Sequence, residues 1–159
     1  MNWLGRIAGA TLAALSVGSC AKPERATKIE ELRFPVAVLF GNGSMLLCQQ
    51  PGQLTTMHTN YIVLNSETPL LIDADFKINS LDHFRSVHGG LWLMAHPSGA
   101  TEVTFELRPQ KSEREEARKL FAHQLQKQTW RQDFESKRQA LSRSQSLLEM
   151  AQTVQTTSD

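Results

Sequence analysis

The chain has 159 residues, of which 40% are hydrophobic and 21% are charged, and its 17 basic and 16 acidic residues leave a net charge of +1. This composition is typical of a folded soluble protein and excludes a polytopic membrane protein, a collagen-like fibre and a wholly disordered chain. A net charge this small gives no field that would attract nucleic acid, so we expect no nucleic-acid partner. The two cysteines are too few for a disulfide scaffold or a four-cysteine zinc site.

The first residues of the chain, 1–19, have the pattern of an export signal. Arg6 is the one charged side chain before Lys22, and a run of small and apolar residues lies between them. The run is about a dozen residues long, shorter than the roughly 20 residues that a membrane-spanning helix needs. A basic start, a short apolar stretch and small residues at its end are typical of a secretory signal peptide. We therefore predict that residues 1–19 direct export and are removed.

The end of this segment, Val17-Gly18-Ser19-Cys20, resembles the lipobox of bacterial lipoproteins. The resemblance implies that Cys20 is lipidated on its thiol and becomes the N-terminus of the mature chain. With Ala21 at the next position, it also implies an outer-membrane lipoprotein that faces the periplasm. Several acyl chains would anchor the protein stably, because each buried methylene contributes about 0.8 kcal/mol. Two alternatives stay open: cleavage after Ala21, which gives a soluble periplasmic protein, and an organelle transit peptide.

Changes in composition divide the rest of the chain into segments. Residues 20–33 are polar and charged, which predicts a tether. Residues 34–109 contain β-branched and aromatic runs separated by turn residues, and they predict a small antiparallel β-rich domain. Asn42-Gly43 predicts a hairpin, because both residues tolerate a positive φ, and Pro51-Gly52 predicts a second turn. The expected strands are residues 34–40, 45–48, 56–64, 70–72, 91–96 and 101–107, and one short helix is expected at residues 80–88.

The C-terminal residues, 110–155, contain neither Pro nor Gly and predict one long helix, followed by a disordered tail at 156–159. Ser112 and Glu115 match a capping box at the start of this helix. A helix of about 40 residues is about 60 Å long. A domain of this size is only about 30 Å across, so part of the helix would extend beyond it.

The uncovered part of such a helix must be solvated, fold back, or pack on another chain. Its apolar residues Trp130, Phe134 and Leu141 fall on one side, so we predict that they bind a protein partner or a second copy. The alternative is a frayed, solvated helix, and the Ser-rich stretch at residues 141–146 is a possible break.

Two groups of residues are candidates for chemistry. Cys48 and His58 could supply a thiol nucleophile and its base, although a cysteine on an apolar strand is more often a buried core residue. Asp73, Asp75 and His83 could hold a metal or act as acid and base, although acidic residues at the end of a strand commonly belong to a turn. The chain contains no phosphate-binding glycine motif. We therefore expect no catalytic residue, no metal and no cofactor.

These predictions combine into an α+β protein: a small antiparallel β-rich domain with one short helix, followed by a long C-terminal helix. We expect a membrane-anchored envelope lipoprotein that acts as a structural, assembly or partner-binding subunit and catalyses no reaction. The alternatives are a periplasmic enzyme that uses one of the two groups above and a periplasmic ligand-binding module.

Overall fold

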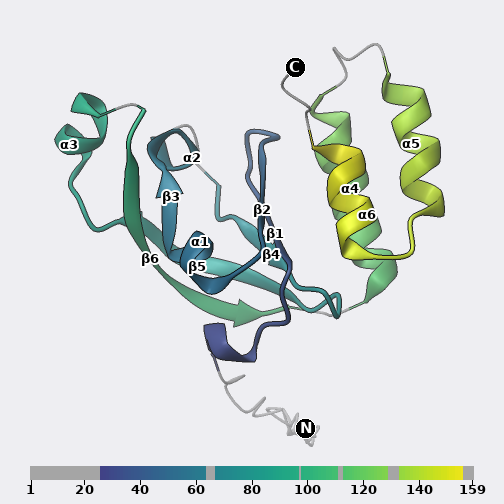
Figure 1. Cartoon of the computed structure of the whole chain (residues 1–159), viewed down its shortest axis with the longest axis horizontal. Helices are drawn as coiled ribbons and strands as arrows, with labels where there is room; N and C mark the ends of the chain where they lie inside the picture. Colours follow the sequence, from purple (N-terminus) through teal and green to yellow (C-terminus); the bar gives the residue numbers. More distant parts are fainter. Residues whose placement is uncertain (1–25, 64–66, 97, 111–112, 129–132, 156–159) are drawn as a thin grey trace, which may run out of the picture.

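The computed structural model describes residues 26–63, 67–96, 98–110, 113–128 and 133–155 (Figure 1). Within these residues the fold is α+β, as the sequence predicts, and a curled six-stranded antiparallel sheet has the strand order β2-β1-β4-β5-β6-β3. The strands are β1 (Val36–Leu39), β2 (Met45–Cys48), β3 (Thr56–His58), β4 (Leu70–Ile72), β5 (Ile78–Ser86) and β6 (Ala100–Pro109). The helices are the 3-10 turn η1 (Ile29–Glu31), α1 (Pro51–Thr55), α2 (Thr59–Val63), α3 (Gly90–Ala95), α4 (Arg114–Gln126), α5 (Phe134–Arg143) and α6 (Leu147–Val154).

The first hairpin forms where the sequence predicts it. β1 pairs antiparallel with β2, with Val36 opposite Cys48. In the turn, the amide of Phe40 donates to the carbonyl of Ser44 at 3.0 Å. Gly43 has a φ of 89°, a left-handed conformation that glycine adopts without steric cost. The hairpin is therefore confirmed, but of the Asn-Gly pair only Gly43 has a positive φ, and Asn42 contributes through its side chain, which accepts a hydrogen bond from the amide of Ser44 at 3.0 Å.

The sheet separates two hydrophobic cores. One core lies between the sheet and helices α4, α5 and α6, which Figure 1 shows together on one side of the molecule. The other lies on the opposite face, where η1, α1 and β3 cover it. Successive side chains of a strand point to opposite faces of the sheet. Because both faces are covered, all four residues of β1 are buried. Ala37 and Leu39 enter the first core, and Val36 and Val38 enter the second.

The prediction of one long helix over residues 110–155 is wrong, because this stretch contains three helices. α5 ends at Arg143 and α6 begins at Leu147, and Ser144 between them has an extended ψ of 133°. The chain folds back at this point because Leu141 and Leu147, each 2% exposed, enter the same core. Residues 129–132, which link α4 to α5, lie outside the described residues.

A capping box fixes the start of α6. The hydroxyl of Ser146 accepts a hydrogen bond from the amide of Glu149 at 3.2 Å, and the Glu149 carboxylate accepts one from the amide of Ser146 at 3.4 Å. The box predicted at Ser112 lies outside the described residues. Helix α4 has Glu113 at its N-cap, and the side chain of Glu113 makes no capping hydrogen bond.

Two predicted elements in the middle of the chain have the other secondary structure. Residues 80–88, predicted as a helix, belong mostly to β5, where Ser80 pairs with Leu70 of β4 and Arg108 of β6. Pairing with β4 as far as Ser80 and with β6 along most of the strand outweighs the local three-residue spacing of apolar side chains. The strand predicted at residues 91–96 is wrong, because residues 91–95 belong to α3, which has Gly89 at its N-cap and buries Leu93.

The segment after the first hairpin is also more helical than predicted. The expected strand at residues 56–64 is β3 for three residues and then α2. The expected turn at Pro51 is the start of α1, where proline occupies the first turn because the missing N–H is not needed there. These short helices cover the second core, and Leu54 of α1 is fully buried in it.

The predicted tether, residues 20–33, is described from residue 26 onward, and this part lies on the domain. Thr27 forms an isolated antiparallel bridge with Leu107 of β6. Leu32, which is 7% exposed, belongs to the second core. Among the helices that the structure describes, none is both long enough and apolar enough to cross a membrane.

The capping box gives a test of the α5–α6 break. Replacing Ser146 by Ala should lower the free energy of unfolding by about 1 kcal/mol, because the amide of Glu149 loses its acceptor. Chemical denaturation measures this change. Ser142→Ala is the matched control, since the Ser142 hydroxyl only bonds back to the Gln139 carbonyl within α5. An equal loss of stability in both variants would contradict a special role of the cap.

Candidate functional site

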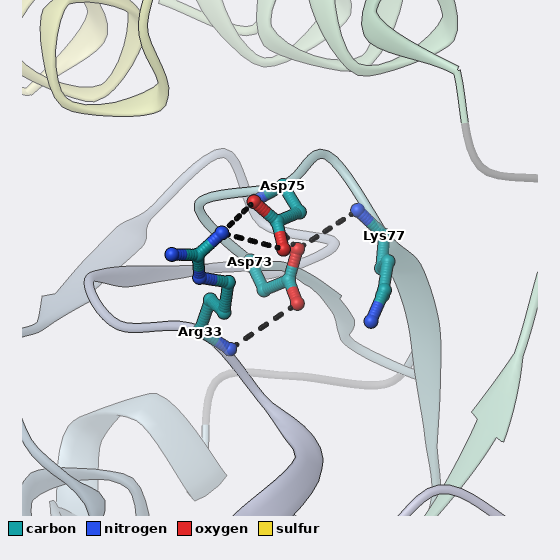
Figure 2. Close-up of polar contacts among 4 residues, drawn as sticks. All are labelled: Arg33, Asp73, Asp75 and Lys77. Carbon is teal, nitrogen blue, oxygen red and sulfur yellow. Dashed lines mark hydrogen bonds and ion pairs between the residues drawn. The ribbon is translucent and has the colours of Figure 1, made fainter.

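The acidic pair predicted as a metal or acid–base site lies in the turn between β4 and β5. Asp73 is fully buried, and its Oδ1 accepts hydrogen bonds from the amides of Asp75 and Lys77, each at 2.9 Å. Its Oδ2 accepts one from the amide of Arg33 at 3.3 Å (Figure 2). The amide of Ala74 in turn donates to the carbonyl of Arg33 at 2.9 Å. Asp73 therefore closes the turn and ties the segment before β1 to it.

The neighbouring acid makes an ion pair with the same arginine. A carboxylate oxygen of Asp75 lies 3.1 Å from the Arg33 guanidinium, and both side chains are exposed (Figure 2). His83 lies elsewhere, at the β-bulge of β5, where its φ is 55°. In the ranges that the structure describes, no group of three His, Cys, Asp or Glu residues is arranged to hold a metal ion. The structure brings Asp73 and Asp75 together, but His83 does not complete the set.

The second candidate group, Cys48 and His58, does not have the features of a nucleophile and its base. Cys48 is fully buried among apolar side chains of the second core, and this burial raises the pKa of its thiol to about 11. Burial also raises the pKa of Tyr61, and negative charge on Cys48 would raise it further. The Nδ1 of His58 accepts a hydrogen bond from the amide of Asn60 at 3.4 Å. A thiol that stays protonated in an apolar core is a packing residue.

The predicted partner-binding residues of the C-terminal region are distributed between the core and the undescribed part of the chain. Leu141 is 2% exposed and belongs to the first core, and Phe134 is partly buried against the same core. Trp130 lies outside the described residues. The long uncovered helix from which this surface was inferred is absent, so a role of Trp130 in partner binding stays a prediction that the structure does not test.

Small hollows flank the exposed loop that precedes β4. One has a volume of about 260 Å³ and is lined by Ile62, Glu67, Leu81 and His83 among others. Ligand sites for drug-sized molecules occupy about 300–1,000 Å³ and enclose most of the ligand. This hollow lies just below that range, whereas a hollow of about 350 Å³ beside Leu70 and Leu120 and one of about 530 Å³ between α5 and α6 lie within it.

Among the described residues, the three most exposed large apolar side chains lie in or beside α3, a surface that sequence reasoning missed. Leu91 is 85% exposed, Met94 is 74% exposed and Val87 is 56% exposed. Helix α3 connects β5 to β6 and lies at the far end of these two strands, well away from α4, α5 and α6 (Figure 1). We call residues 86–101 the α3 tip. An exposed apolar cluster of this kind commonly marks an interaction site.

Several contacts hold the α3 tip on the body of the protein. The hydroxyls of Ser86 and Thr101 lie 2.7 Å apart across the β5–β6 ribbon. Thr59, which is fully buried at the start of α2, donates its hydroxyl to the carbonyl of His96 at 3.0 Å. Leu93 points inward and is 8% exposed. The helix therefore packs on the body of the protein through Leu93, while Leu91 and Met94 lie one turn apart on its outer side.

A stack of three rings runs along the α3 tip. The ring of Trp92 lies between those of His88 and His96, with centroid distances of 4.2 and 4.5 Å. The Nδ1 of His96 also lies 3.0 Å from the carbonyl of Trp92. This spacing of four residues between rings was a helical signal in the sequence. A second signal was charge, because residues 86–101 contain no Asp, Glu, Lys or Arg.

Comparison with known proteins adds no relative to this description: no protein-family model, no curated protein and no solved structure matches the chain.

The Asp73 turn yields a stability prediction that also separates a structural role from a metal site. Asp73→Ala should lower the free energy of unfolding by at least about 2 kcal/mol, because three backbone amides lose their charged acceptor. Asp75→Ala, the matched control, should cost less than about 1 kcal/mol, since its ion pair is exposed. Thermal melting with and without a chelator measures both effects. A chelator-sensitive melting temperature that both substitutions abolish would contradict the structural role.

The buried thiol yields a reactivity prediction. A pKa raised from 9.0 to about 11 lowers the thiolate fraction near pH 8 about 100-fold, and burial blocks access as well. Alkylation of the native chain, followed by mass spectrometry of the peptide that contains Cys48, should therefore be at least about 100-fold slower than alkylation of the denatured chain. Rapid labelling of native Cys48 would revive the nucleophile interpretation.

Proposed function

We propose that the protein is an envelope lipoprotein, anchored by lipid on Cys20, that serves as a non-catalytic structural or assembly subunit at a membrane. The anchor is supported by the basic start, the short apolar run and the cysteine at its end. The five residues between Cys20 and Ala26 reach at most about 20 Å when extended, so the domain would stay close to the bilayer.

The geometry of the candidate chemical groups supports the non-catalytic part of the proposal. The carboxylate of Asp73 is engaged by three backbone amides, and Cys48 is a buried thiol with a raised pKa. Catalytic acids and nucleophiles must reach a substrate atom, which neither of these buried groups can do.

The observation that carries the proposal is the exposed α3 tip. A short helix that projects Leu91 and Met94 into solvent from the ends of β5 and β6 is suited to binding a neighbouring surface. Folding alone does not require these side chains outside the core. A subunit held at a membrane and equipped with an apolar contact surface matches a structural or assembly role.

The lipid anchor can be tested by substitution of the cysteine. In a bacterial host supplied with a labelled fatty acid, the wild-type chain should incorporate the label and appear at the mature mass. Cys20→Ala should incorporate none and accumulate as the longer precursor, because the attachment atom is missing. The matched control is Cys48→Ala, which removes the other cysteine and should leave labelling and mass unchanged. Unchanged labelling of the Cys20→Ala chain would overturn the lipoprotein proposal.

A further inference from the structure

We propose that the α3 tip enters the membrane interface and forms a second contact with the bilayer, in addition to the lipid on Cys20. The inference rests on the proposed function, since the anchor is what keeps a lipid surface within reach. The expected target is the headgroup and upper acyl region of a bilayer, and the inserting side chains are Val87, Leu91 and Met94.

The charge distribution around α3 favours a lipid surface. Arg85 and Glu102 mark the last charged side chains at the base of the α3 tip, and both are exposed. Beyond them, the tip carries no Asp, Glu, Lys or Arg. Burial of ionised groups is what makes insertion costly, so this boundary sets a depth to which the tip can enter at little cost. An interfacial helix lies about 5–10 Å deep, which is comparable to the length of α3.

The side chains proposed to insert are already exposed on a fixed helix before the protein meets the bilayer. Leu91 and Met94 already expose most of their surface, so their apolar area is lost from water only when a partner covers it. Trp92 is half-buried between two histidine rings at the flank of the helix, and tryptophan is enriched at membrane interfaces. Because the ribbon and Thr59 fix the helix, little conformational entropy is lost on binding.

The size of the surface favours lipid over a second copy of the chain. Three side chains of this size expose a few hundred Å² together, whereas a stable dimer buries about 800 Å² on each partner. The flanking charges have opposite signs and offer no charge pattern that would select a protein partner. A small apolar contact is sufficient for membrane binding when a second anchor is present, because two weak attachments act together.

Quenching of Trp92 by lipid tests the insertion. The full chain, processed in the host, is reconstituted into vesicles of phosphatidylethanolamine and phosphatidylglycerol that contain brominated phosphatidylcholine. The emission lost on Trp92→Phe isolates the Trp92 signal from that of Trp130, because Trp3 is removed with residues 1–19. We expect the brominated lipid to reduce Trp92 emission about twofold. Because the tip contains no Asp, Glu, Lys or Arg, added salt at pH 8 should leave this quenching unchanged.

A pair of variants separates the α3 tip from exposed apolar residues in general. The double variant Leu91→Ser with Met94→Ser should abolish most of the quenching, and both side chains are exposed, so the fold should persist. Leu148→Ser is the matched control, because Leu148 is 38% exposed on α6 and should not contribute. Equal quenching in the double variant and the wild type would overturn the inference.

The same samples distinguish failure of the inference from failure of the proposed function. Labelled fatty acid on Cys20, combined with unquenched Trp92, would overturn tip insertion and leave the lipid anchor in place. Quenched Trp92 in a chain whose Cys20 incorporates no labelled fatty acid would support insertion and overturn the anchor. Unquenched Trp92 together with a dimer that the double variant dissociates in sedimentation would overturn insertion in favour of a second copy.

Discussion

Strand β1 is buried on both of its faces, and this double burial dictates where most other elements lie. All four of its residues are buried, so one flat layer of cover on a single face of the sheet could not satisfy the strand. The C-terminal helices cover the face of Ala37 and Leu39, and η1, α1 and β3 cover the face of Val36 and Val38. A single long helix would leave part of the first face in water, because it crosses a small sheet once. Three short helices cover it.

Buried amides tie the helical layer to the first hairpin. The side-chain amide of Gln124 donates to the carbonyls of Phe40 and Ser44 at 2.9 and 2.6 Å, and that of Gln128 donates to the carbonyl of Gly43 at 3.1 Å. These hydrogen bonds satisfy turn carbonyls that the fold has removed from water. The end of helix α4 is thereby hydrogen-bonded to the backbone of the Asn-Gly turn. The turn geometry and the position of the helical layer therefore depend on each other.

Features that local sequence determines were predictable, and features that non-local pairing determines were not. The β1–β2 hairpin follows from residues within a dozen positions of one another, and the sequence predicts it correctly. β5 does not follow, because Asp82 and Arg85 flank a bulge that shifts the alternation, and pairing with β4 and β6 decides the outcome. Of the candidate site residues, Cys48 is a buried core residue and Asp73 is a turn residue, which are the structural interpretations that the sequence analysis offered for them. The α3 tip escaped because a strand was expected there.

The α3 tip contains apolar residues that the stability of the fold does not require. Leu93 accounts for the attachment of α3 to the body, and Gly89 accounts for where the helix starts. Neither accounts for Leu91 and Met94, which contribute nothing to either core and increase the apolar surface in water. A polar residue at each position would serve the fold better, since exposed apolar clusters promote aggregation. Their exposure is explained if a second surface covers them, and a bilayer is the surface that we propose for this role.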